Sequence, residues 1–169
     1  VTTVMDIGTG AGFPGVPLKI AFPHLEACLL DSLKKRVNFL EETFELLKLQ
    51  NITAIHGRAE EFAKNKSYRE TYDLCVSRAV SNLATLSEYC LPYVKVGGKF
   101  ISYKSGTVQE EVEQAEKAIR ILGGKIQDVV YFNLPDSEIQ RSLVVIEKIK
   151  PTPGKYPRKA GTPLKEPLS

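Results

Sequence analysis

A glycine-rich stretch near the start of the chain carries the residue types best suited to chemistry. Asp6 follows the apolar pair Val4 and Met5, and a turn-like sequence comes directly after it. Glycine adopts backbone angles that other residues avoid, and without a Cβ it lets the main chain approach a ligand closely. A strand that leads into such a turn and then into a helix is typical of nucleotide-binding sites. The turn contains four glycines, Gly8, Gly10, Gly12 and Gly15.

Two classes of nucleotide fit this turn. Residues 10–15 satisfy the G-x-G-x-x-G pattern of dinucleotide-binding proteins, and Asp31 could serve as the acid that binds a ribose. Three features favour a methyl donor instead. Asp6 precedes the first glycine, and the Phe13-Pro14 pair stands where a pyrophosphate needs open backbone amides. The last strands of the chain also differ from the all-parallel pattern of dinucleotide-binding dehydrogenases. We therefore expect a methyl-donor site, with the dinucleotide as the alternative.

Strand and helix patterns alternate behind this turn, which predicts a mostly parallel sheet covered by helices on both faces. Ligands of such sheets bind at the carboxyl ends of the strands, near the point where the strand order reverses. Strands are expected at residues 3–7, 25–30, 52–56, 73–77, 99–104, 126–133 and 143–149. Helices are expected at residues 15–22, 33–48, 59–63, 83–93 and 108–122.

The last two expected strands separate the two classes of nucleotide. Only the nine residues 134–142 connect them, and this segment is too short and too polar to supply a crossover helix. A connection without a helix makes the pair antiparallel. A parallel sheet that ends in an antiparallel hairpin resembles the seven-stranded, Rossmann-like fold of S-adenosylmethionine-dependent methyltransferases.

Composition sets outer limits on the protein. A chain of 169 residues with 43% hydrophobic residues is expected to form one α/β domain. Cys28, Cys75 and Cys90 are widely spaced among apolar neighbours, and His24 and His56 stand apart from them, so we expect neither disulfides nor a metal site. No apolar run or leader sequence is evident, so a cytoplasmic protein is expected.

The net charge of +3 is unevenly distributed. Residues 150–169 contain five basic residues, one acidic residue and half of the ten prolines, whereas residues 1–149 are slightly acidic. Proline excludes an inner strand or a helix, so this segment is expected to be an extended, basic arm. Either a solvated terminus or a phosphate-contacting arm fits that composition. The expected division is a methyltransferase domain at 1–149 and a basic proline-rich arm at 150–169, packed on or over the same domain.

Six motifs distributed along the chain carry a resemblance to a known family. They lie at residues 6–15, 23–24, 30–40, 57–60, 77–79 and 155–163. Together they resemble the RsmG or GidB family of small-subunit ribosomal RNA guanine-N7 methyltransferases. One departure is Ser105 between Lys104 and Gly106, where many relatives have Lys-Gly directly. The family carries a further N-terminal helical segment, so this chain, which opens inside its first strand, resembles a truncated member.

The resemblance implies that S-adenosyl-L-methionine is the cofactor. Gly8 and Gly10 would let the backbone approach its methionine moiety, and Asp31 would accept both ribose hydroxyls or instead cap the following helix. Glu60 would read the adenine edge with its neighbour's amide, or simply favour the helix dipole. The implied donor contacts are Gly8, Gly10, Phe13, Asp31, Ala59, Glu60 and Arg78.

The implied reaction is methyl transfer to N7 of a guanine in 16S ribosomal RNA. Guanine N7 carries a free lone pair at neutral pH, so the enzyme needs alignment rather than a nucleophile or base. Arg78 is the expected positioning residue, with a structural ion pair as its alternative role. The motifs expected for exocyclic amino methylation or for cytosine C5 methylation are not found: residues 77–79 read Ser-Arg-Ala, and Cys75 lies inside a strand.

The expected partner is 16S ribosomal RNA or the small-subunit particle, bound by a monomer through charge and base stacking. Arg158 and Lys159 are expected to matter most, with Phe13 and Tyr156 available for stacking. A nicotinamide-dependent oxidoreductase and a donor-binding module without activity are the competing functions. The expected RNA contacts are Lys34, Lys35, Arg36, Lys104, Tyr156, Arg158 and Lys159, with Arg58 and Arg78 as further cations.

Overall fold

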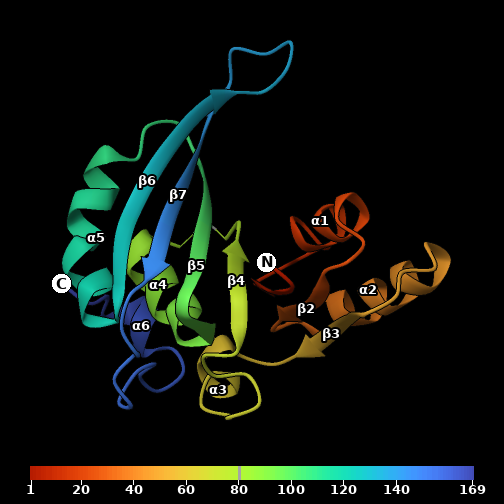
Figure 1. Ribbon diagram of the computed structural model, residues 1–169, viewed down its shortest axis with the longest axis horizontal. Helices are drawn as coiled ribbons and strands as arrows, with labels where there is room; N and C mark the ends of the chain where they lie inside the picture. Colours follow the sequence, from red (N-terminus) through yellow and green to blue (C-terminus); the bar gives the residue numbers. More distant parts are fainter. Residues whose placement is uncertain (80) are drawn as a thin grey trace.

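The computed structural model describes residues 1–79 and 81–169. Within these residues, seven strands form one sheet in the order β3-β2-β1-β4-β5-β7-β6 (Figure 1). The strands are β1 (Thr3–Ile7), β2 (Glu26–Asp31), β3 (Ile52–His56), β4 (Tyr72–Ser77), β5 (Val94–Ser105), β6 (Gly124–Asn133) and β7 (Gln140–Lys148). The helices are α1 (Gly15–Ala21), α2 (Lys34–Leu46), α3 (Ala59–Phe62), α4 (Leu83–Cys90), α5 (Gln109–Ile121) and α6 (Thr162–Lys165).

The predicted fold class is confirmed. Strands β1 to β5 pair in parallel, whereas β7 lies antiparallel to β5 on one side and to β6 on the other. The short connection between β6 and β7 forces this geometry, because it leaves no room for a crossover. The resulting hairpin rises well past the carboxyl end of β4 (Figure 1).

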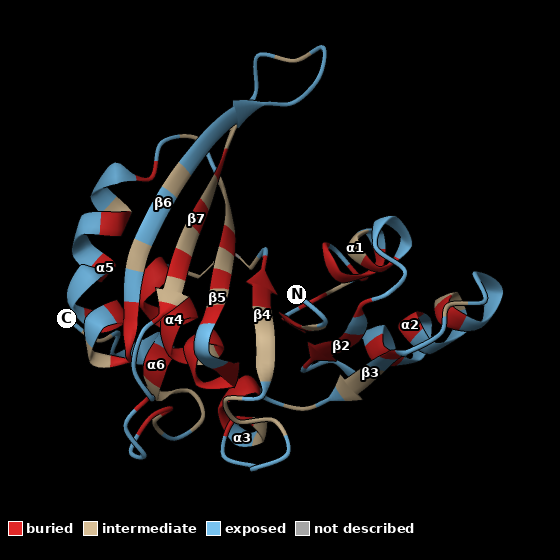
Figure 2. Cartoon of the chain, viewed as in Figure 1, coloured by how far each residue is buried: buried red, intermediate tan, exposed pale blue. Residues whose placement is uncertain are grey.

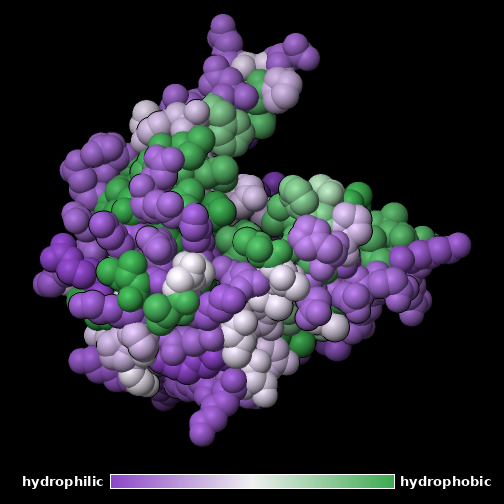
Figure 3. All heavy atoms as spheres, viewed as in Figure 1, coloured by the Kyte–Doolittle hydropathy of each residue, from purple (hydrophilic) through white to green (hydrophobic). Residues whose placement is uncertain are grey.

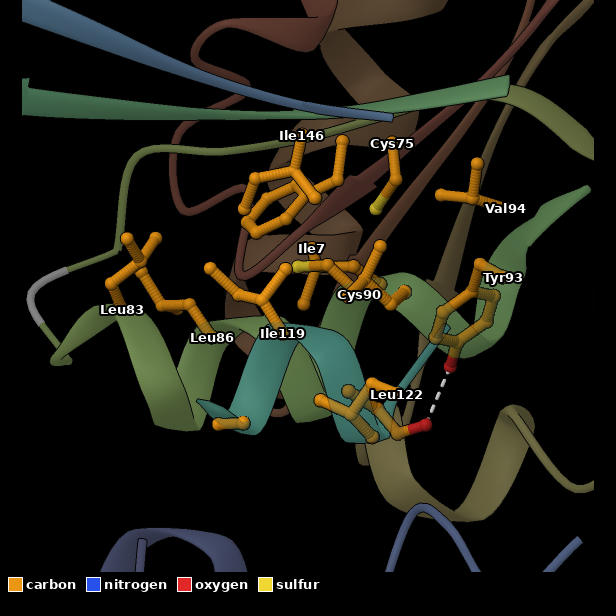
Figure 4. Close-up of a cluster of buried hydrophobic side chains, with 14 of the residues drawn as sticks. Ile7, Cys75, Leu83, Leu86, Cys90, Tyr93, Val94, Ile119, Leu122 and Ile146 are labelled. Atoms are coloured by element: carbon orange, nitrogen blue, oxygen red, sulfur yellow. Dashed lines mark hydrogen bonds between the residues drawn. The ribbon is translucent and has the colours of Figure 1, made fainter. Parts of the chain in front are cut away.

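Alternating side chains of the strands build a core on each face of the sheet. Cys28 and Leu30 of β2 belong to the larger core, formed with α3, α4 and α5, whereas Ala27 and Leu29 pack with α1 and α2. Figure 4 shows the larger core, with the Tyr93 hydroxyl donating to the backbone oxygen of Ala59 at 2.6 Å. All three cysteines are buried and free.

Helices do not cover the two faces of the sheet equally. Strands β5 and β7 alternate between buried side chains, which face α4 and α5, and half-buried ones on the opposite face (Figure 2). Tyr103 and Leu143 belong to the half-buried set and are paired partners in the ladder. The face of β5 and β7 that is turned away from α4 and α5 is therefore only partly covered, from the vicinity of α1 to the hairpin.

Two sequence predictions about elements were wrong. The fifth strand begins at Val94 rather than near residue 99, and pairs with Tyr72 across a register shift. Residues 150–169 are not an extended arm, since they form turns and the four-residue helix α6, with Pro163 in its first turn. Proline is tolerated at that helical position because its missing N–H would have no partner there.

Strand order reverses between β1 and β4, the central neighbours from which the chain winds in opposite directions. Gly8 follows β1 and Arg78 follows β4, so the two loops meet at the carboxyl edge of the sheet. A Cβ built on Gly8 would lie 3.7 Å from the Cβ of Ala79. This is the position at which sheets of this type bind ligands.

Candidate active site

The glycine turn is held by backbone hydrogen bonds to the neighbouring strand. The amides of Gly8 and Thr9 both donate to the Leu30 oxygen, at 2.9 and 3.1 Å. Gly8 has φ +67°, a value that only glycine adopts without strain. Gly12 has φ +101°, and a Cβ there would lie 2.6 Å from a methyl carbon of Val16. The turn therefore requires glycine for its conformation and for close packing on α1.

Asp6 fixes the far end of this turn. Its Oδ2 accepts hydrogen bonds from the Thr9 hydroxyl at 2.7 Å and from the Gly15 amide at 2.8 Å, while Oδ1 has no hydrogen-bond partner among the described residues. Burial raises the pKa of Asp6 to about 6, against the lowering effect of these two donors and of Arg78. Asp6 therefore orients the backbone amide of Gly15 at the end of the turn.

Asp31 connects the turn to the second strand. Its Oδ2 accepts the Gly10 amide at 2.8 Å and its Oδ1 accepts the Leu33 amide at 3.0 Å, with the Arg36 guanidinium 3.5 Å away. Leu33 is itself the residue that precedes α2, so Asp31 does not cap an amide inside the helix. Because Arg36 also donates to Oδ2, Oδ1 is the oxygen that keeps a second lone pair for a ligand hydroxyl.

A cavity of about 170 Å³ lies where β1, β2, β3 and β4 end. Three of the predicted donor residues, Gly8, Ala59 and Glu60, line it, together with residues that the sequence did not single out, such as Tyr89 of α4. Gly10, Phe13, Asp31 and Arg78 are not among its lining residues. The lining is Ile7, Gly8, Leu30, Ser32, Gly57, Arg58, Ala59, Glu60, Ala79, Ser81, Leu86 and Tyr89.

One carboxylate oxygen of Glu60 is hydrogen-bonded to the C-terminal segment. Glu60 is only 3% exposed, and its Oε1 accepts the backbone amide of Gly161 at 2.9 Å. Ala59, beside it, is the first residue of α3 and receives the Tyr93 hydroxyl on its oxygen. Glu60 is therefore held by a residue 101 positions away in sequence, and Ala59 by one 34 positions away.

A larger cavity of about 900 Å³ begins beside the first. The two share Ala79, directly after Arg78. The Arg78 guanidinium lies 5.5 Å from the centre of the Phe13 ring, a cation–π contact that places Phe13 beside a residue of the larger cavity's lining. The lining is Arg78, Ala79, Asn82, Tyr103, Lys104, Ser105, Glu111, Phe132, Leu134, Arg141, Ser142 and Leu143.

The predicted RNA contacts divide into three groups. Lys104 lines the larger cavity, where its Nζ donates to the Ser81 oxygen at 2.8 Å and to Glu111 at 2.7 Å. Lys34, Lys35 and Arg36 are exposed at the start of α2, outside both cavities. The third group lies in the C-terminal segment.

The structure does not bring the C-terminal group to either cavity. Arg158 donates from Nε and from its terminal nitrogen to the fully buried Glu88, at 2.7 to 3.2 Å. Tyr156 is 9% exposed and packs into the larger core, so its ring offers no open face to a base. Lys159 is exposed but lines neither cavity. The burial of Tyr156 therefore argues against the stacking role that the sequence predicts.

The sequence missed the hairpin. Phe132, Leu134 and Arg141 line the larger cavity, although none was expected to contribute. A usable signal existed, because residues 129–132 read Val-Val-Tyr-Phe and are apolar on both faces of their strand. Such a strand is expected to have both faces covered or in use.

Two further findings concern the described part of the chain. None of its helices is both long enough and apolar enough to cross a membrane. No group of three or more His, Cys, Asp and Glu residues in it is placed to hold a metal ion.

Solved structures of low sequence identity share this fold. A putative transferase from Pyrococcus horikoshii superimposes with a TM-score of 0.69 at 13% identity, covering 88% of this chain and 58% of that one. M. jannaschii TYW2, solved in complex with AdoMet, gives a TM-score of 0.67 at 15% identity over 87% of this chain and 69% of that one.

Sequence relatives are much closer. The ribosomal RNA small subunit methyltransferase G of Lachnoclostridium phytofermentans is 58% identical over 166 residues, which are 98% of this chain and 69% of the relative. The protein of the same name from Acetivibrio thermocellus is 57% identical, over 98% of this chain and 68% of that relative. A family model described as rRNA small subunit methyltransferase G matches residues 1–144. With its glycine turn, its switch-point cavities and these relatives, the chain belongs to the GidB family, that of the rRNA small subunit methyltransferases G.

Proposed function

We propose that this protein transfers a methyl group from S-adenosylmethionine to N7 of a guanine in 16S ribosomal RNA. One observation carries the proposal beyond family membership. A small cavity bounded by the glycine turn and a large cavity bounded by cations and aromatic rings meet at Ala79, on the reversal point of the sheet. A donor in the first and a base in the second would be held face to face.

The residues of the smaller cavity fit the donor. Gly8 leaves open the space that a side chain would occupy next to Ala79, and the half-buried Tyr89 provides a hydroxyl at the opposite wall. Burial raises the pKa of Tyr89, so its hydroxyl stays neutral. The donor would extend beyond this cavity toward Asp31, since 170 Å³ is below the usual volume of a ligand site.

The chemistry needs alignment more than activation. The bound donor supplies an activated methyl group, and guanine N7 supplies a free lone pair. The chain's own residues hold the two partners in line, which can lower the barrier by about 7 kcal/mol or more. Burial, with a smaller contribution from the charge of Asp6, raises the pKa of Tyr103 in the larger cavity, so no phenolate base arises there at neutral pH.

Arg78 is the proposed positioning residue. It lines the larger cavity, lies beside the shared Ala79 and contacts the ring of Phe13. Its guanidinium can donate to O6 of guanine, on the edge that also carries N7. Phe13, 47% exposed, adds an aromatic surface next to Arg78.

The remaining features follow from the substrate. Ribosomal RNA places the protein in the cytoplasm, and we propose that it acts as a monomer on 16S RNA or on the small-subunit particle. We retain residues 1–149 as the catalytic domain and assign residues 150–169 to its support. Glu88, Glu60 and Arg69 hold this segment against the domain.

The test combines binding and activity. Calorimetric titration is expected to show binding of S-adenosylmethionine and no binding of NADH, and deproteinised small-subunit RNA is expected to gain 7-methylguanosine, measured by mass spectrometry. Binding of NADH alone would establish the oxidoreductase instead. Donor binding without methyl transfer either to deproteinised RNA or to the small-subunit particle would establish a binding module. Methylation at another base atom would refute the N7 assignment alone.

A further inference from the structure

The hairpin of β6 and β7 presents a mixed aromatic and cationic surface to the larger cavity. Phe132 of β6 and Arg141 of β7 are directly paired in the ladder, so their side chains lie on the same face. Tyr103 of β5 and Leu143 of β7 form the next such pair toward the sheet. All four line the cavity. Together they make one continuous wall, which we name the hairpin wall.

This wall extends farther than a single base requires. The cavity volume of about 900 Å³ is near the upper end of the range for ligand sites. The transfer point lies at Ala79, whereas the hairpin continues well past the end of β4 (Figure 1). Figure 3 shows hydrophobic surface gathered below the polar tip of the hairpin and continuing along the hollow toward α1. Space therefore remains beside the base that is methylated.

The charges around this space suit a polyanion. Its cations are Arg78, Lys104 and Arg141, and its one acid among the described residues, Glu111, is bonded to Lys104. Arg141 forms no ion pair with any residue that the structure describes. Unpaired arginine next to an exposed phenylalanine is the combination that proteins use to stack bases and contact phosphates in single-stranded RNA.

We propose that Phe132 and Arg141 form a stacking platform for the nucleotide next to the target guanine. The inference rests on the function proposed above and adds a second subsite to it. Phe132 stacks on the neighbouring base and Arg141 contacts its phosphate, which holds the strand extended while the guanine reaches Ala79. A segment of polypeptide packed on the hairpin wall would have no use for the unpaired Arg141. It would also have no use for a wall that continues to the transfer point at Ala79.

The hairpin supplies a matched control. Tyr131 precedes Phe132 on the same strand and is equally exposed, at 41% against 39%, but points to the opposite face and does not line the cavity. Phe132→Ala is expected to raise the KM for RNA by about 5- to 150-fold, the usual effect of losing one stacked base. Its kcat at saturating RNA and its affinity for S-adenosylmethionine stay unchanged. Tyr131→Ala leaves all three values near wild type, and Phe132→Trp restores the KM.

A second measurement locates the interaction. Single-stranded RNA oligonucleotides with one guanine, carrying an abasic site on its 5′ or 3′ side, are titrated by fluorescence anisotropy. One abasic site is expected to weaken binding to the wild type and to make no further difference for Phe132→Ala. Additive losses, or equal effects of the Phe132 and Tyr131 variants, overturn the platform. Reduced thermal stability of Phe132→Ala with unchanged RNA binding identifies a polypeptide-covered surface instead.

The two levels of failure are distinguishable. A wild-type protein that binds the oligonucleotides with this pattern but transfers no methyl group contradicts the proposed reaction and leaves the platform standing. Methylation of RNA by the wild type, with the same KM for RNA in the Phe132→Ala variant, contradicts the platform alone.

Discussion

At the scale of single residues, the site depends on acids that are buried before any ligand arrives. Asp6 and Asp31 are 0% and 2% exposed, and both use carboxylate oxygens to hold amides of the glycine turn. Neither acid is a nucleophile in this arrangement. Their effect is to fix the main chain of Gly10 and Gly15 so that the turn keeps one shape.

Asp6 gives the stability of the protein a particular pH dependence. Its pKa rises from 3.8 in the unfolded chain to about 6 in the fold, so its contribution is complete below pH 3.8 and is lost as pH rises through 6. The variant Asp6→Asn keeps an acceptor for Thr9 and Gly15 but does not titrate. The free energy of unfolding of wild type, relative to this variant, is expected to fall by about 2 kcal/mol between pH 4 and pH 7.

Urea unfolding at several pH values checks this prediction. The opposite effect of Asp73, whose pKa is lowered by Lys95 and by two backbone amides, is present in both proteins and cancels in the difference. Asp136→Asn, at an exposed position on the hairpin loop, serves as the control and is expected to give no such trend. A difference between wild type and Asp6→Asn that stays constant with pH would show that Asp6 is not desolvated.

At the scale of elements, the C-terminal segment acts as a brace. Arg69 donates to the backbone oxygens of Tyr156 and Thr152, and Glu70 accepts the Thr152 amide while contacting the fully buried Lys148. Arg158 is bonded to Glu88 on α4. Removing residues 151–169 would expose these groups together, so the loss of donor binding is expected along with the loss of RNA methylation.

Glu88→Gln tests the brace. The change removes the charge of a fully buried carboxylate and leaves Arg158 without its counter-ion, a loss of about 3 to 5 kcal/mol in comparable pairs. Both the melting temperature and the affinity for S-adenosylmethionine are expected to fall, because the next residue, Tyr89, lines the donor cavity. Thermal unfolding and calorimetry measure the two effects.

The matched variant removes charge without breaking a salt bridge of the brace, and it removes one cation–π contact, between Lys155 and the Tyr156 ring, worth about 0.5 to 1 kcal/mol at an exposed site. Lys155 and Lys159 are exposed and form no salt bridge among the described residues. The double variant Lys155→Ala, Lys159→Ala is expected to keep its stability within about 1 kcal/mol of wild type, together with wild-type donor affinity and KM for RNA. A raised KM for RNA with unchanged stability would instead support the basic arm that composition suggested.

Local patterns predicted most of the elements, and contacts between distant residues explain where they failed. The antiparallel finish was predictable because a short polar connection admits only one geometry. The start of β5 was not, since Gly97 and Gly98 interrupt the apolar pattern although the strand continues through them. Nothing local to Arg158 indicates its bond to Glu88, seventy positions earlier. Glu60 was predicted as a site residue. Its hydrogen bond with the Gly161 amide was not predictable, because the two residues are 101 positions apart and only the fold brings them together.

At the scale of the whole molecule, the two cavities differ in their balance of charge. The smaller cavity has one cation, Arg58, and one acid, Glu60, whereas the larger cavity has three cations, Arg78, Lys104 and Arg141, and one acid, Glu111. RNA affinity is therefore expected to fall with salt, with a slope of about −1.4 to −3 in log K against log salt for two to four phosphate contacts. Donor affinity, measured by calorimetry over the same salt range, is expected to change little. A flat RNA titration would place RNA binding outside the cationic cavity.

The hydrogen bond between Glu60 and Gly161 has a consequence for protein synthesis. Translation must add 101 residues after Glu60 before this bond can form. At 5–20 residues per second the delay is roughly 5 to 20 seconds, during which strands β4 to β7 are synthesised. The hydrogen bond that holds Glu60 can therefore form only after all seven strands of the sheet have been made.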